Sequence, residues 1–117
     1  MTLEFLSPES RKAIAEALNE HSRITKKYKH HKILDDGIND ALKFARVELA
    51  CAEAQGRPEQ AKRWRQAMLE ARISGRGNLS RLALEIENEG HEMSFFGKGD
   101  ESWETYGKAL LNLASSL

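Results

Sequence analysis

A group of carboxylates near residues 35–40 is the first candidate for chemistry in this chain. Three carboxylates, Asp35, Asp36 and Asp40, stand close together and could act as an acid–base pair. Such a pair also needs a partner base and a pocket, and no pattern in the sequence supplies either of them. We therefore expect Asp35 and Asp36 to cap a helix and Asp40 to lie on a solvated face. We expect no enzymatic activity.

Four histidines raise the alternative of a metal site. His30 and His31 are adjacent, so on a helix they point in different directions, whereas a chelating pair stands four residues apart. His21 and His91 could join them only if the fold brought distant segments together. Cys51 is the single cysteine, which excludes an internal disulfide, and its apolar neighbours predict a small buried core residue. We expect no metal and no other cofactor.

A basic run from Ser22 to Lys32 is the strongest charge feature of the sequence. It holds five cations and no acid, although the whole chain is neutral, with 18 basic and 18 acidic side chains. The run could grip nucleic-acid phosphates, helped by Tyr28, or could be an ordinary solvated surface. The neutral total counts against strong nonspecific affinity for DNA. The cations of this candidate phosphate-contact arm are Arg23, Lys26, Lys27, Lys29 and Lys32.

Length and composition predict one compact soluble domain. The chain has 117 residues, of which 40% are hydrophobic and 31% charged. No apolar run approaches the roughly 20 residues that span a bilayer. The N-terminus also lacks a basic segment followed by an apolar one, as a signal peptide would have. We therefore expect a cytoplasmic protein that does not enter a membrane.

Helical periodicity dominates the first half of the chain. Ser7-Pro8-Glu9 is typical of a helix start, and this helix is expected to reach about His21, with an extension through the basic run left open. Apolar residues then recur every three or four positions from Ile38 to Ala52. A second apolar strip on the same segment predicts a central helix, buried on more than one side and ended by Gly56.

The second half predicts further helices and no strand. Pro58 opens a third helix, and Asn78 or Ser80 starts a shorter one. Gly97 and Gly99 then separate a loose stretch from a last helix, which Asp100 or Ser102 caps. The expected helices cover about residues 58–73, 78–86 and 100–117, with one or two looser turns in 87–99.

Two segments of the C-terminal half resemble a known group. Leu79-Ser80-Arg81-Leu82-Ala83 is similar to the first helix of a helix-turn-helix motif, and Gly99-Asp-Glu-Ser-Trp-Glu-Thr-Tyr-Gly-Lys-Ala-Leu110 is similar to its closing segment. In these residues the chain resembles lambda-repressor-like helix-turn-helix proteins of the addiction-module antidote type, the antitoxins. The resemblance implies a small transcription regulator that binds double-stranded DNA as a homodimer and could also bind a cognate toxin.

Periodicity and resemblance together predict an all-α fold with five to six helices. An N-terminal helical segment, 1–56, would precede a lambda-repressor-like helix-turn-helix domain, 57–117, in one continuous globular unit. The turn of the motif is expected at Glu87-Asn88-Glu89-Gly90, where the family has Gly-Leu-Ser-Arg. An alternative alignment inserts two residues, which shifts Gly90 into the turn and makes Met93 and Phe96 the inward residues. Both alignments stay open at this point.

The resemblance also implies which residues would face DNA. Glu87, Glu89 and Glu92 would lie close to phosphates and repel them, so the reading surface depends on the remaining polar residues. The candidate DNA-binding residues are Arg76, Ser80, Arg81, Asn88, His91, Ser94 and Lys98.

The aromatic residues support an alternative function. Trp64, Trp103 and Tyr106 occur at helical spacing, which is more typical of a core than of a stacking platform for single strands. Phe95 and Phe96 are adjacent, so both cannot face the same core, and we expect one of them in a dimer interface. The alternative is a helical protein–protein interaction module with a degenerate helix-turn-helix. It would bind a toxin or host factor, and not DNA.

Overall fold

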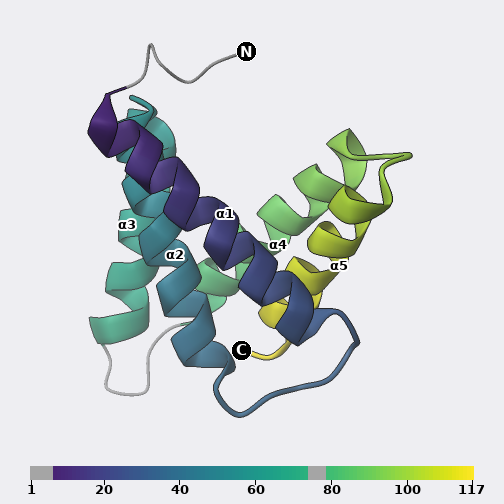
Figure 1. Ribbon diagram of the computed structural model, residues 1–117. Helices are drawn as coiled ribbons and strands as arrows, with labels where there is room; N and C mark the ends of the chain where they lie inside the picture. The colour runs from purple at the N-terminus through teal and green to yellow at the C-terminus, as the bar shows by residue number, and fades with distance from the viewer. Residues whose placement is uncertain (1–6, 74–78) are drawn as a thin grey trace.

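The computed structural model describes residues 7–73 and 79–117, and all regular structure within them is helical (Figure 1). The prediction of an all-α fold is confirmed. No described helix is both long enough and apolar enough to cross a bilayer. The helices are α1 (Pro8–Tyr28), α2 (Gly37–Ala54), α3 (Pro58–Ile73), α4 (Ser80–Phe96) and α5 (Glu101–Ser115).

Local signals place most helix ends where the sequence predicts them. The Ser7 hydroxyl accepts a hydrogen bond from the Ser10 amide at 3.1 Å, and Pro8 occupies the first turn of α1. The Asp100 carboxylate caps α5 in the same way, at 3.0 Å from the Ser102 amide. Gly56 follows α2 with a φ of 67°, a left-handed conformation that glycine adopts without strain. Helix α1 continues to Tyr28, which is the longer of the two expected extents.

Helix α2 is central, as its two apolar strips predict. It contacts each of the other four helices, and all five contribute to one hydrophobic cluster. Because every helix buries apolar surface in this cluster, the core ties the two halves of the sequence together. The largest fully buried side chains are Tyr28, Phe44, Ile24, Leu82, Ile86, Leu110 and Leu113.

The turn expected at residues 87–90 is wrong in both alignments. Ser80–Phe96 is one uninterrupted helix, so the two halves of the expected motif do not cross at an angle. Leu82, Ile86 and Gly90 follow one another every four residues and are all buried. The glycine that indicates a turn in the sequence serves instead in a helix–helix contact with α5. Helices α4 and α5 form a hairpin whose turn lies at the upper right edge of Figure 1.

Candidate functional site

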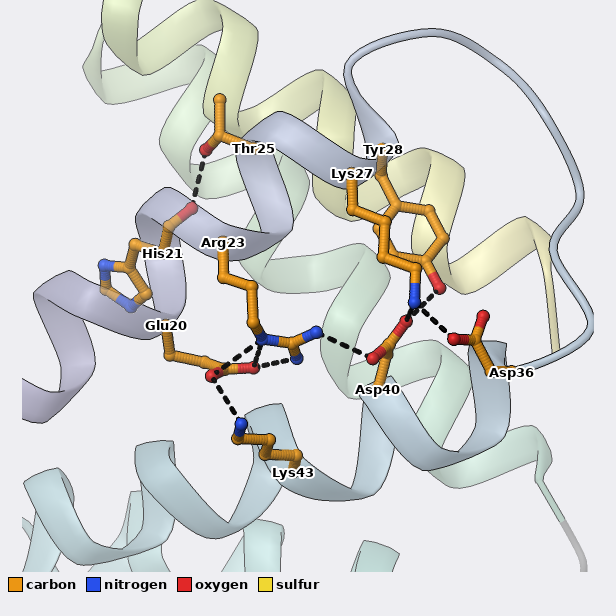
Figure 2. Close-up of polar contacts among 9 residues, drawn as sticks. All are labelled: Glu20, His21, Arg23, Thr25, Lys27, Tyr28, Asp36, Asp40 and Lys43. Atoms are coloured by element: carbon orange, nitrogen blue, oxygen red, sulfur yellow. Dashed lines mark hydrogen bonds and ion pairs between the residues drawn. The ribbon is translucent and has the colours of Figure 1, made fainter.

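A network of ion pairs joins α1 to α2 (Figure 2). The guanidinium of Arg23 lies between two buried carboxylates, with Nε 3.0 Å from Glu20 Oε1 and Nη1 2.7 Å from Asp40 Oδ1. Lys27 reaches Asp40 Oδ2 at 2.8 Å and also pairs with Asp36. Each carboxylate is thereby neutralised by a cation from α1, which is the condition under which buried charges are tolerated.

Asp40 is the centre of this network. Tyr28 is fully buried, and its hydroxyl donates to Asp40 Oδ2 at 2.6 Å. Burial alone would raise the pKa of Asp40, but hydrogen bonds from Lys27, Tyr28 and Arg23 outweigh burial and hold that pKa below its usual value. The expectation of a solvated Asp40 is therefore wrong. Asp36 stands at the cap position of α2, but its carboxylate makes no capping hydrogen bond there.

The network changes the interpretation of the basic run. Arg23 and Lys27 are engaged with acids of the same chain, and the ring of Tyr28 is buried. Lys26, Lys29 and Lys32 are exposed and form no ion pair with the residues that the structure describes. Only these three cations of the expected phosphate-contact arm remain available to a partner.

The residues expected to contact DNA differ in their surroundings, although four of them, Ser80, Arg81, Asn88 and His91, are exposed on α4. Arg81 donates to Glu70 of α3 at 2.6 Å, and Ser94 lies against Gly107 of α5. Asn88 and His91 are exposed on α4, together with Leu84. Ser80 begins α4 and Lys98 lies in the exposed turn that follows it, whereas Arg76 lies outside the described residues.

The histidines also stay apart. His31 contacts Asn112 at 3.0 Å, and His91 stands 3.5 Å from Glu87, one turn away on α4. His30 is exposed, and His21 contacts Glu48 of α2 at 2.7 Å. Within residues 7–73 and 79–117, no three histidine, cysteine or acidic side chains are grouped as metal ligands would be.

An exposed aromatic group lies where α4 ends and α5 begins. Phe95 and Phe96 are 74% and 78% exposed, and their rings meet edge to face with centroids 5.2 Å apart. Trp103 is 45% exposed, so the expectation that it belongs to the core is wrong. We call Phe95, Phe96 and Trp103 the aromatic end. Met93, Phe96, Gly97 and Trp103 line a pocket of about 240 Å³ beside it.

A second cavity, which we call the central pocket, has a volume of about 180 Å³ and lies among the helices. His21 donates from Nε2 to the Glu48 carboxylate at 2.7 Å, and its ring packs on that of Tyr106 at a centroid distance of 4.6 Å. Helix α4 adds Glu89 and Glu92. The pocket therefore collects polar groups from several helices around one aromatic ring. The lining residues that matter below are His21, Glu48, Glu89, Glu92, Trp103 and Tyr106.

Burial shifts the titration of three groups at this pocket. It raises the pKa of Glu89 to about 7, with further contributions from the nearby Glu48 and Glu92 carboxylates. Burial, followed by the charges of Glu48 and Glu89, raises the pKa of the Tyr106 hydroxyl. Cys51 lines the same pocket and is half-buried, not fully buried as expected. Burial and Glu48 raise the pKa of its thiol, which makes it a poor nucleophile.

The central pocket corresponds to no sequence motif, but the spacing of two of its acids is a signal of it. Glu48 stands four residues after Phe44 and four before Ala52, so it interrupts a stripe of buried residues. Glu89 likewise falls next to Gly90 and three residues after Ile86 on the inner side of α4. A charged side chain at helical spacing within an apolar stripe indicates a polar group held inside the fold.

Comparisons with protein-family models, with curated proteins and with solved structures found no match.

Proposed function

We propose that this protein is a helical interaction module that binds another protein through the aromatic end. The observation that carries this proposal is the exposure of two adjacent phenylalanines, at 74% and 78%, at a helix end. Exposed apolar groups surrounded by polar residues are typical of protein-binding surfaces. Aromatic side chains also dominate the energetics of such interfaces.

Charge around the aromatic end indicates the chemistry of the partner. Residues 87–104 contain six acids and a single lysine, Lys98. Five of those acids are exposed, on α4, in the turn and on the first turn of α5. A partner with an apolar cavity and a rim of lysine or arginine would match both features. The exposed acids are Glu87, Glu92, Asp100, Glu101 and Glu104.

A capture experiment with three forms of the protein tests this proposal. The wild type, the double variant Phe95→Ser/Phe96→Ser and the control Leu69→Ser would be immobilised and exposed to extract of the native cell. Leu69 is a matched control, because it is also apolar and about half exposed but lies on α3. A partner retained by wild type and control, but lost from the double variant, would then be purified and titrated.

The proposal expects the purified partner to bind wild type and Leu69→Ser equally, and to bind the double variant at least about a hundredfold more weakly. Binding should also weaken as salt rises, because the acids around the aromatic end add an electrostatic contribution. Equal capture by all three forms would overturn it. Sedimentation of the isolated chain gives a second check: self-association that the double variant abolishes would assign the aromatic end to a second copy.

DNA binding is a second proposal, favoured by one observation. Lys26, Lys29 and Lys32 are exposed and carry no intramolecular ion pair within the described part of the chain. Three such cations could contact phosphates without reading bases. The uninterrupted α4 removes the expected reading helix from this proposal, so any binding would be independent of DNA sequence.

A further inference from the structure

The central pocket adjoins the aromatic end, because Met93 and Trp103 line both this pocket and the one beside the aromatic end, but neither Phe95 nor Phe96 lines the central pocket. Its side chains come from segments far apart in the sequence: His21 on α1, Glu48 on α2, Glu89 on α4 and Tyr106 on α5. Helix packing alone does not require this combination, since apolar residues at these positions would fill the space. The central pocket thus gathers polar side chains from four helices at a position that apolar residues could have filled.

Tyr106 provides an observation independent of the acids. Its side chain is only 6% exposed, yet its hydroxyl has no hydrogen-bond partner among the described residues. No described polar atom that is sealed from solvent lacks a partner, so this hydroxyl is reached by solvent, and Tyr106 lines the central pocket. Buried tyrosine hydroxyls normally find a partner, and an occupant of the pocket would supply it here.

The carboxylates that line the central pocket favour an occupant with a positive charge. Three carboxylates, Glu48, Glu89 and Glu92, line the pocket together with His21 and Arg57. His21 pairs with Glu48 at 2.7 Å, and Arg57 contacts Gln60 at 3.4 Å. Arg63 of α3 lies near enough to lower the pKa of Glu89 but forms no ion pair with it. A half-buried carboxylate without an ion-pair partner among the described residues is stabilised by a cation that enters beside it.

We infer that the central pocket binds a small organic cation, an ammonium or guanidinium group held by the Glu89 and Glu48 carboxylates and packed against the ring of Tyr106. Both groups donate several hydrogen bonds, which suits carboxylates and an unpaired phenolic oxygen. Both also bind aromatic faces, and Tyr106 and Trp103 supply such faces. A pocket of about 180 Å³ is smaller than the ~300–1,000 Å³ of drug-sized sites.

A metal ion does not fit the same lining. Among the described residues, no three histidine, cysteine or acidic side chains are close enough together to ligate one ion. An organic cation makes weaker demands, because its hydrogen bonds and ring contacts tolerate a wider spacing of partners than coordination bonds do.

Titrations with simple probes test the inference at pH 8, where Glu89 is mostly ionised because its pKa lies near 7. Butylguanidinium and butylammonium present the free cation, and n-butanol is the neutral control of similar shape. Short capped peptides with one central arginine or lysine present the same groups as side chains. Binding is followed by NMR shifts of the Tyr106 ring and by the increase in thermal stability.

We expect both cations to bind in the millimolar range or tighter and n-butanol to leave the Tyr106 signals unchanged. Tighter binding of the peptides would assign the cation to a protein side chain, and tighter binding of the free probes to a small molecule. Failure of every cationic probe to bind, or an equal response to n-butanol, would overturn the inference.

Three variants assign the binding to this pocket. Glu89→Gln should weaken cation binding by about tenfold, because it removes the charge and keeps the shape. Tyr106→Phe deletes only the hydroxyl and should weaken binding severalfold. This second variant keeps the inference testable if Glu89→Gln fails to fold. Glu87→Gln is the matched control, since it changes an exposed acid of α4 outside the pocket. Equal weakening by Glu87→Gln and Glu89→Gln would overturn the assignment.

The same probes separate this inference from the proposed function. The double variant Phe95→Ser/Phe96→Ser should bind butylguanidinium as the wild type does, because neither phenylalanine lines the central pocket. Loss of cation binding in that variant would show that the two adjoining sites do not act independently.

Discussion

Gly90 of α4 and Gly107 of α5 face each other where the two helices pack. A β-carbon added to Gly90 would stand 2.9 Å from the Gly107 carbonyl oxygen, and one added to Gly107 would stand 2.7 Å from the Gly90 carbonyl oxygen. Both distances are shorter than van der Waals contact, so the two backbones approach as closely as they do only because neither residue has a side chain. The hairpin that carries the aromatic end depends on this pair.

Gly90→Ala should therefore destabilise the protein by about 1–3 kcal/mol through overpacking. Alanine favours a helix by about 1 kcal/mol over glycine, so propensity alone predicts the opposite sign. Urea unfolding at pH 7 measures the difference, with Asn88→Ala as the control because Asn88 is exposed on the same helix. A variant as stable as the wild type would show that α4 and α5 can move apart without a loss in the free energy of unfolding.

Asp40→Asn tests the ion-pair network between α1 and α2. The substitution leaves Arg23 and Lys27 without the carboxylate that neutralises them, and it should lower the free energy of unfolding by about 2–4 kcal/mol at pH 7. Asp35→Asn is the control, since Asp35 is exposed, and it should change stability by less than about 0.5 kcal/mol.

The effect of Asp40→Asn should also depend on pH. The pKa of Asp40 is lower in the folded state than its ordinary value of 3.8, so its stabilising contribution is present above that value. The contribution disappears as pH falls through the lower, folded-state pKa. Unfolding measured between pH 7 and pH 2.5 should show the two proteins converging only at the acid end. A difference that persists unchanged there would mean that the introduced amide acts through packing and not through the lost charge.

Glu89→Gln should show the opposite dependence. The pKa of Glu89 is raised from 4.5 to about 7 in the folded state, so the group favours folding below pH 4.5, and this contribution is lost as pH rises through 7. Wild type and variant should be similar at pH 4.5. At pH 8.5 the variant should be more stable, by up to about 3 kcal/mol. Urea unfolding across this range measures the effect.

The control for Glu89→Gln is Glu87→Gln, which lies on the same helix but is exposed. Its stability difference from wild type should not grow with pH. A parallel response of both variants would assign the pH dependence to the net charge of α4. The titratable groups near Glu89 that must be considered are His21 of α1, Glu48 of α2, Arg57 before α3, Arg63 of α3, Glu85 and Glu92 of α4, and Tyr106 of α5.

Mobility shifts on mixed duplex DNA test the second proposed function. If Lys26, Lys29 and Lys32 each contact a phosphate, replacing all three by glutamine should make the slope of log K against log salt concentration less negative by about 2.7. Lys27→Gln is the contrast, because Lys27 is paired with Asp36 and Asp40 and should not change the slope. If the wild type produced no mobility shift at low salt, the proposal of DNA binding would be wrong.

Helix ends were predictable from the sequence because their signals are local. Ser7 and Asp100 accept hydrogen bonds from amides two or three residues away. Gly56 adopts a left-handed backbone conformation that depends only on its own lack of a side chain. The central position of α2 was also predictable, since its apolar residues occupy more than one side. These features depend on neighbours within about one helical turn, which the order of residues specifies directly.

Contacts between helices were not predictable in the same way. Gly90 could break a helix or let another helix approach, and only the presence of Gly107 opposite it decides between the two. Asp40 is buried because Arg23, Lys27 and Tyr28 converge on it from α1, and His21 meets Glu48 from 27 residues away. The sequence by itself determined which segments are helical and which faces are apolar. Tertiary structure decided which polar groups those faces enclose, because that depends on how the helices dock and not on the spacing within any one of them.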